Sequence, residues 1–225
     1  GCNLRFFFDS IRYSEDMDLD IKGIEIHKLQ DVVLNIITGV SFANSLRTYQ
    51  IERIIPPDMK VAKQTETGQR FKIHLINSAQ EDLFTKIEFS RRGIESGILM
   101  ESIDTNVLHR YHLLPFVVPH YPSYLAISQK ISALAGRAAP QARDVFDIYS
   151  LSSRIDNKAL AKILKNFSST KIKTAHDNLF AMSFREFKDT VCSFLTGEDL
   201  NTYANSNAWD DIQLKVSAIL EGANK

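Results

Sequence analysis

Residues 12–20 read RYSEDMDLD, and this stretch decides how the rest of the chain is interpreted. In an extended strand alternate side chains share one face, so the carboxylates of Asp16 and Asp18 are expected to point the same way. Two hard anionic ligands side by side suit a Mg²⁺ ion that carries a nucleoside triphosphate. The pair alone is weak evidence of function, because most Asp-x-Asp pairs are solvated charges or turn residues. Many metal-dependent glycosyltransferases also carry one.

A later stretch, residues 85–89 with the sequence TKIEF, places a carboxylate and an ammonium group on one face of a predicted strand. Glu88 is the candidate third metal ligand, which would position a second metal ion and help to activate an acceptor hydroxyl. Lys86 is a candidate substrate contact, and the plainer interpretation is that it pairs with Glu88 across the face. Three converging carboxylates beside an ammonium group predict metal-assisted phosphoryl or nucleotidyl transfer.

Two blocks of sequence resemble a known family. Residues 1–5 (GCNLR) and 12–19 resemble the Gly-Gly/Ser…Arg-x-Ser-x-Asp-x-Asp-Leu signature of the AbiEii toxin family, which belongs to the polymerase-beta-type nucleotidyltransferase superfamily. Residues 125–134, Arg137 and residues 143–149 resemble the family's downstream Lys…Ala-Leu…Arg…Arg-Asp-x-x-Asp motif. The resemblance covers about residues 1–151, and the two blocks occur in the family's order.

The resemblance implies a bacterial nucleotidyltransferase of a toxin–antitoxin (abortive infection) system. Such an enzyme would use Mg²⁺, with Mn²⁺ as a substitute, and transfer a nucleotide from an NTP to an acceptor, for which tRNA is a candidate. It also implies a cognate antitoxin protein as a partner. One alternative is a non-catalytic nucleotide- or RNA-binding protein that retains the nucleotidyltransferase fold. A metal-dependent glycosyltransferase is the other, and the helical second half of the chain argues against it.

The resemblance also assigns roles around the first block. Gly1 is expected to let the backbone approach the triphosphate, because glycine has no Cβ. Ser14 is a candidate phosphate contact. The alternative, which is equally supported, is that its hydroxyl forms a hydrogen bond with the backbone. Cys2 stands where the family commonly has Ser or Thr. Since the chain starts at Gly1 without a Met, we expect its native N-terminus to have been trimmed or left out.

In the second block, the resemblance makes Lys130 a contact for the nucleotide's phosphates and Asp144 a catalytic residue, with Asp147 as a substrate-binding residue. Asp144 and Asp147 are three residues apart and therefore share a helical face. The structural alternative is a buried salt-bridge network with Arg137 that docks the helices. For Asp144 the two interpretations are equally supported.

The order of the expected elements predicts an α+β fold. An amphipathic helix over residues 29–37 and strands over 51–55, 71–76 and 84–89 form a nucleotidyltransferase-type mixed sheet with helices in residues 1–118. The last two of these strands are expected to pair antiparallel around residues 77–80. A helical bundle is predicted in residues 119–225. Its expected helices cover 124–134, a segment from Pro140 to Leu151, a segment capped by Asp156 or Asn157, a segment after the Ser183–Glu186 capping box, and 209–220.

Composition limits the remaining possibilities. The 225 residues carry 27 basic and 27 acidic side chains, so no overall field attracts the chain to nucleic acid or membrane, and any nucleic-acid site must be a local patch. Lys158, Lys162 and Lys165 form such a patch on one helix face, either as a solvated surface or as a contact for an RNA backbone. The cysteine usage and the short apolar N-terminal run predict a cytoplasmic protein without a membrane partner.

Overall fold

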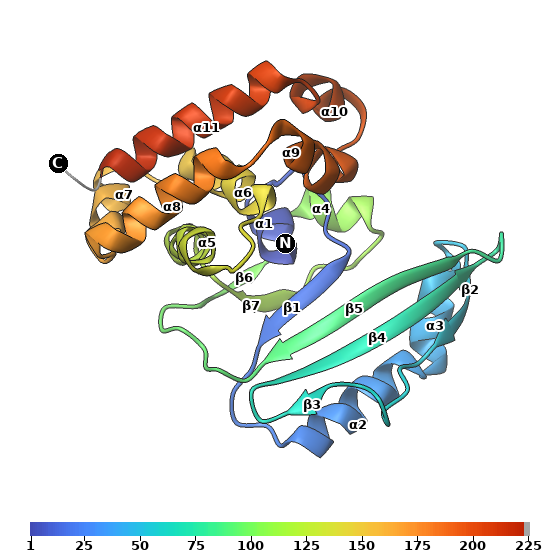
Figure 1. The fold of residues 1–225 in the computed structure, drawn as a ribbon. Coiled ribbons are helices and arrows are strands. Elements are labelled where there is room, and N and C mark those ends of the chain that lie inside the picture. Colours follow the sequence, from blue (N-terminus) through green and yellow to red (C-terminus); the bar gives the residue numbers. More distant parts are fainter. Residues whose placement is uncertain (223–225) are drawn as a thin grey trace. The chain divides into compact units, whose positions relative to one another are not determined.

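The computed structural model describes residues 1–222, which form two compact units (Figure 1). The first unit contains Gly1 and Ser14–Ser96, and the second contains Cys2–Tyr13 and the chain from Gly97 onward. None of the helices within the described residues is long and apolar enough to cross a membrane. The elements of the first unit are β1 (Asp16–Asp20), α2 (Ile26–Ile37), α3 (Val40–Arg47), β2 (Ile51–Ile55), β3 (Gln64–Thr65), β4 (Gly68–Asn77) and β5 (Asp82–Ser90).

These strands form one five-stranded mixed sheet in the order β1-β5-β4-β2, with β3 paired to β4. β1 and β5 run parallel, whereas the other pairs are antiparallel. β4 and β5 form the expected hairpin: the backbone N–H of Glu81 donates to Asn77 Oδ1, and Gln80 takes a positive φ of 61° in the turn. The α+β prediction with a mixed sheet is confirmed.

The core of the first unit lies between the sheet and α2, which runs along one sheet face (Figure 1). Leu29, Val33 and Ile37 follow the helical period of α2 and are buried against Phe71 and Ile73 of β4. Since successive strand residues alternate between faces, the residues that follow Phe71 and Ile73 by one position point to the other side of the sheet. That second face is polar and carries the candidate metal ligands.

The second unit is mainly helical. Its elements are α1 (Cys2–Phe7), β6 (Leu99–Ser102), α4 (Thr105–Arg110), β7 (Val117–His120), α5 (Ser123–Gly136), α6 (Ala142–Ser152), α7 (Asn157–Leu164), α8 (Ser169–Ala181), α9 (Phe184–Thr190), the 3₁₀ helix η1 (Cys192–Phe194), α10 (Gly197–Tyr203) and α11 (Ser206–Glu221).

One large core joins α5, α6, α8 and α11. Ile127 and Ile131 of α5 and Ile148 of α6 are fully buried, and burial of each such side chain contributes about 1.5–3 kcal/mol. Phe187 stacks on Trp209 with ring centroids 4.6 Å apart. The predicted capping box is present at Ser183 and Glu186, and Asp156 caps α7 as expected.

Several segments differ from the sequence-based expectation. α6 begins at Ala142 after an extended Gln141, two residues later than the start predicted from Pro140. α8 was not predicted, because its buried residues, Ile172, Ala175 and Leu179, are few and include a small one. Residues 2–7 form α1, for which no helix was predicted. The β6–β7 hairpin was also missed, since its strands are short, flank a helix and include a proline.

The division into units differs from the expected boundary after residue 118. β6 pairs with β7, which lies directly before α5, and this pairing ties residues 99–120 together in the second unit. Arg12 belongs to the same unit through its ion pair with Asp147. The second unit is therefore a helical bundle with a small two-stranded sheet attached.

Candidate active site

The polar face of the first unit's sheet brings the predicted acidic residues together. In the parallel pairing of β1 and β5, Asp16 lies opposite Lys86, and Asp18 lies opposite Glu88. Residues directly opposite each other on neighbouring strands, and residues two apart on one strand, share a face. The expected common face for the two aspartates, Lys86 and Glu88 is confirmed.

Lys86 links the two strands through ion pairs. Its Nζ lies 2.7 Å from Asp16 Oδ2 and 3.5 Å from Glu88 Oε1. The hydrogen bond with Asp16 raises the pKa of the Lys86 ammonium, although burial opposes the shift. Glu88 has a second cation beside it, because Arg70 Nε of β4 lies 2.5 Å from the same Oε1 atom. Lys86 therefore pairs with Glu88 as the plainer interpretation expected, but its shorter contact is with Asp16.

The donor set on this face suits a hard divalent cation. Asp16 and Glu88 already share one cationic group, so their oxygens approach a common point from two strands. Carboxylate oxygens are the ligands that Mg²⁺ prefers. Among the described residues, however, no three His, Cys, Asp or Glu side chains stand together as a ready metal-binding group. The assignment of Asp16, Asp18 and Glu88 as a ligand triad therefore stays a prediction.

Ser14 and Gly1 lie next to each other beside β1. The Ser14 hydroxyl donates to the backbone oxygen of Asp16 at 2.9 Å, which is the backbone-bonding alternative raised by the sequence. A Cβ built on Gly1 would collide with Ser14 Oγ, so this glycine permits the close approach. Thr85, which the sequence did not single out, anchors the start of β1 by donating to the backbone oxygen of Glu15. The contacts of Gly1 and Ser14 with phosphate stay predictions.

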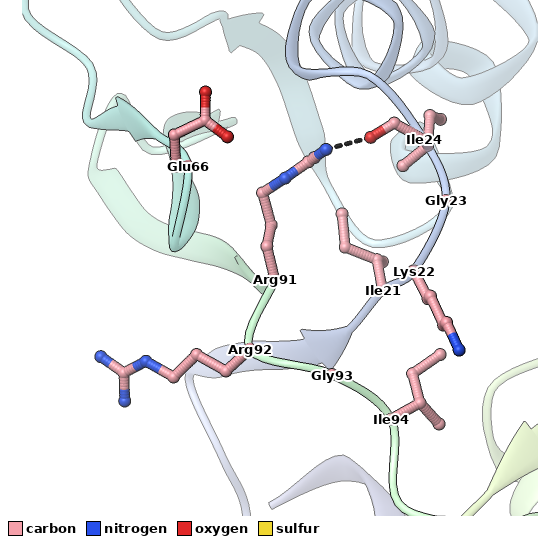
Figure 2. A pocket seen from close by; sticks show the side chains of 9 residues that line it. All are labelled: Ile21, Lys22, Gly23, Ile24, Glu66, Arg91, Arg92, Gly93 and Ile94. Atoms are coloured by element: carbon pink, nitrogen blue, oxygen red, sulfur yellow. Dashed lines mark hydrogen bonds between the residues drawn. The ribbon is translucent and has the colours of Figure 1, made fainter.

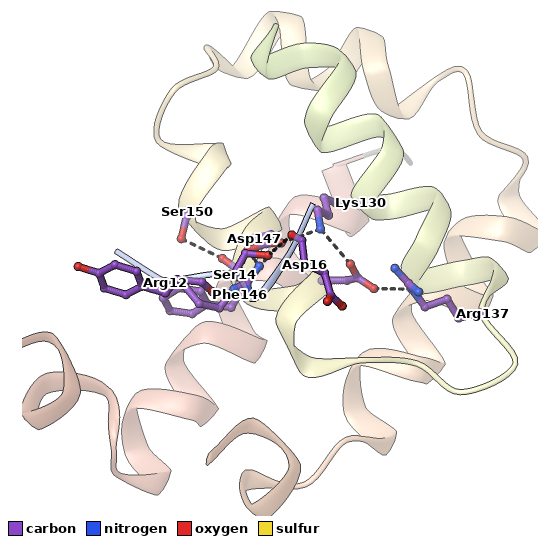
Figure 3. Close-up of polar contacts among 10 residues, drawn as sticks. Arg12, Ser14, Asp16, Lys130, Arg137, Phe146, Asp147 and Ser150 are labelled. Atoms are coloured by element: carbon purple, nitrogen blue, oxygen red, sulfur yellow. Dashed lines mark hydrogen bonds and ion pairs between the residues drawn. The ribbon is translucent and has the colours of Figure 1, made fainter. Parts of the chain in front are cut away.

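The second unit contains a buried ion-pair network (Figure 3). Asp144 and Asp147 of α6 are both 0% exposed. Lys130 of α5 donates to both, with Nζ 3.2 Å from Asp144 Oδ1 and 2.7 Å from Asp147 Oδ2. Arg137 Nε lies 2.8 Å from Asp144 Oδ2, and Arg12 Nη2 lies 3.1 Å from Asp147 Oδ2. Three cations thus surround two buried carboxylates, and the network joins α5, α6 and the segment before β1.

The charges in this network set the ionisation of Asp147. Burial favours the neutral acid, but the positive charges of Lys130 and Arg12 and the hydrogen bond from Lys130 outweigh it, so the pKa of Asp147 is lowered. The salt-bridge network with Arg137 that the sequence suggested is present. Arg12 is the member that sequence reasoning missed, although it stands inside the first motif.

Comparison with known proteins identifies the family. No curated protein matches the chain. The family model described as "Nucleotidyl transferase AbiEii toxin, Type IV TA system" matches residues 1–210. The chain belongs to the AbiEii family. The resemblance seen in the two sequence motifs is thereby confirmed.

A solved structure supports the AbiEii fold. The nucleotidyltransferase toxin MenT4 from Mycobacterium tuberculosis is similar, with a TM-score of 0.58 and 16% sequence identity. The match covers 98% of this AbiEii chain and 73% of the MenT4 chain. At this identity the likeness concerns the fold.

The basic patch of this AbiEii chain is exposed as the sequence predicted. Lys158 and Lys162 lie on the outer face of α7, and Lys165 follows at its C-terminal end. The opposite face of α7 carries Leu160, Ile163 and Leu164, which are buried. The patch is therefore free of the core, and its contact with RNA stays a prediction.

The first unit of the AbiEii chain also contains a cavity of about 330 Å³ (Figure 2). It lies where the chain leaves β1 and β5, lined by Ile21, Lys22, Gly23, Ile24, Glu66, Arg91, Arg92, Gly93 and Ile94. Arg91 links the segment after β5 to the segment after β1, because its guanidinium donates to the backbone oxygen of Ile24 and, at 2.7 Å, to Gln69 Oε1 of β4. No sequence pattern indicated this cavity, and none of the predicted site residues lines it.

Proposed function

We propose that this AbiEii chain is a Mg²⁺-dependent nucleotidyltransferase that transfers a nucleotide from an NTP to an acceptor hydroxyl. The family match supports nucleotidyl transfer by a toxin. The observation that carries the metal dependence is that Asp16 and Glu88, from two neighbouring parallel strands, share one cationic group. An arrangement that concentrates negative charge around one point is suited to a divalent ion.

In this proposal Asp16, Asp18 and Glu88 hold the metal. Bound Mg²⁺ would neutralise charge on the attacking and leaving oxygens during in-line displacement at the α-phosphorus. Glu88 is also proposed to help to activate the acceptor hydroxyl, a role supported by its position on the same face as the aspartates. Pairing of β1 with β5 holds the backbone of these residues in register, so their side chains start from one face of the sheet.

The remaining roles follow from the family's motifs. Lys130 is proposed as the phosphate contact, with the buried Asp144 and Asp147 as residues that position its ammonium. Gly1, Ser14 and Lys86 are proposed substrate contacts. Lys158, Lys162 and Lys165 would neutralise phosphates of an RNA acceptor, for which tRNA is our candidate.

Labelled nucleotide transfer tests the proposal. Purified protein is incubated with Mg²⁺, each α-labelled NTP and total tRNA, and labelled RNA is measured. We expect incorporation from at least one NTP, its loss on adding EDTA, and its loss in Asp16→Asn. Asp20→Asn is the matched control, because this residue lies two positions beyond Asp18 on the same strand and is outside the proposed site. Absence of incorporation from all four nucleotides would count against the enzyme.

The family description, a type IV toxin–antitoxin system, leads us to propose an antitoxin partner. Expression of the chain in bacteria should slow growth, and co-expression of a protein encoded next to it should restore growth. Asp16→Asn should be harmless without the neighbour. If Asp16→Asn slowed growth as strongly as the unchanged chain, the toxicity would not come from nucleotidyl transfer.

A non-catalytic nucleotide- or RNA-binding protein is the second candidate. The observation that favours it is the ion pairing of Lys86 and Arg70 with the acidic face, which neutralises Asp16 and Glu88 within the chain itself. Such a protein would bind NTP or RNA with the same affinity in the presence of Mg²⁺ or EDTA and would transfer no label.

A further inference from the structure

The ammonium of Lys86 lies between two of the proposed metal ligands, where a bound metal ion would otherwise supply the positive charge. Its ammonium lies between carboxylates of two strands, at 2.7 Å from Asp16 and 3.5 Å from Glu88. All three side chains are less than one-third exposed. Without this ammonium, Glu88 would keep its contact with Arg70, but Asp16 would lose its 2.7 Å ion pair on a face that it shares with two other carboxylates, and like charges at close range repel.

The geometry allows this cation to leave while the carboxylates stay. Asp16 and Glu88 are attached to a backbone that is fixed by strand pairing, whereas the ammonium of Lys86 stands at the end of a flexible four-carbon stem. An ammonium group forms three hydrogen bonds but no coordinate bonds. A divalent ion carries twice its charge and binds the same oxygen lone pairs directly, so the two cations compete for Asp16 and Glu88.

We propose that Lys86 is a resident cation that holds Asp16 and Glu88 together in the metal-free protein and is displaced when a divalent ion binds. The inference rests on the proposed function, since it requires a metal at this face. It explains why two candidate ligands stand close together although the described residues contain no ready three-ligand group. Lys86 thereby sets the metal affinity of the site in addition to preserving its shape.

Manganese binding to matched variants tests the inference. Free Mn²⁺ is quantified by electron paramagnetic resonance during titration of wild type, Lys86→Met and Lys72→Met. Lys72 lies opposite Lys86 on β4 and is exposed, with its Nζ 5.9 Å from the Phe84 ring centroid. The substitution Lys72→Met therefore removes a positive charge from the same face of the sheet. We expect Lys86→Met to bind Mn²⁺ about tenfold more tightly, because the ion pairs of Lys86 with Asp16 and Glu88 no longer compete with the metal ion for these carboxylates. Lys72→Met should change the affinity by about twofold or less.

The outcomes separate this inference from the proposed function. One outcome is that Asp16→Asn abolishes Mn²⁺ binding, whereas Lys86→Met binds Mn²⁺ no more tightly than wild type does. This result would overturn the resident-cation role of Lys86 and leave the proposed metal site in place. Mn²⁺ binding that Asp16→Asn leaves unchanged would overturn both.

A measurement on wild-type protein remains decisive if Lys86→Met does not fold. Ammonium groups held in ion pairs exchange protons slowly and give ¹⁵N signals, and Lys86→Arg assigns the signal of Lys86. Saturation with Mg²⁺ should remove this signal. A Lys86 signal that persists unchanged at saturating Mg²⁺ would contradict displacement.

Discussion

Asp147 on α6 accepts hydrogen bonds from Arg12, a residue 135 positions earlier in the chain, and both side chains are buried. A buried carboxylate that loses one of its partners is left with uncompensated charge. The Arg12–Asp147 pair therefore attaches the segment before β1 to the helical unit, and its loss should be costly.

Arg12→Gln should lower the free energy of unfolding by about 3 kcal/mol, because it leaves Asp147 with Lys130 as its remaining cation. Urea denaturation followed by far-ultraviolet circular dichroism measures the change. Arg154→Gln is the control, since its pair with Asp9 is 46% and 63% exposed and such pairs contribute about 1 kcal/mol or less. An equal loss of unfolding free energy in the two variants would show that the buried ion pair stabilises the protein no more than the exposed one.

Acid should destabilise the protein through Asp147. Its pKa in the folded protein lies below the ordinary value of 3.8, so the unfolded chain takes up the proton first as the pH falls. The stability that Asp147 contributes is fully present above its ordinary pKa and is lost as the pH falls below that value towards the folded-state pKa. Urea midpoints measured at successive pH values should fall steeply below pH 3.8 in wild type and less steeply in Asp147→Asn. Asp177→Asn, which changes an exposed carboxylate, should keep the wild-type slope.

Removal of the basic patch should weaken RNA binding without loss of stability. The triple variant Lys158→Gln, Lys162→Gln and Lys165→Gln removes three exposed charges from one end of the helical unit. The slope of log affinity for tRNA against log salt concentration should become shallower by about 2 to 3, since fewer counterions are released. A triple variant of Lys28, Lys188 and Lys215, which are also exposed, removes the same charge elsewhere. If both variants lost the same amount of affinity, net charge and not the patch would explain the binding.

The sequence predicted the parts of the fold that local patterns determine. Alternation placed Asp16, Asp18, Lys86 and Glu88 on strand faces, and Ser183 with Glu186 marked the start of α9. The antiparallel β4–β5 hairpin followed from two strands joined by a short turn. These features depend on residues a few positions apart in the chain, so they can be predicted from a single sequence.

Long-range contacts were harder to predict. The ion pair between Arg12 and Asp147, which lie 135 positions apart in the sequence, was not predicted. Nothing in the local pattern around either residue specifies that pairing. The contact of Lys86 with Asp16 across β1 and β5 likewise depends on parallel strand pairing, which period-two alternation within one strand does not reveal.

The central claim, that the face formed by β1 and β5 binds a divalent metal ion for nucleotidyl transfer, is tested most directly by anomalous diffraction. A crystal soaked with Mn²⁺ and a nucleoside triphosphate should show a manganese peak bonded to Asp16 and Glu88 at about 2.2 Å, with the triphosphate attached to the same ion. Manganese bound elsewhere, with Lys86 still joining Asp16 to Glu88 in the presence of triphosphate, would contradict the claim.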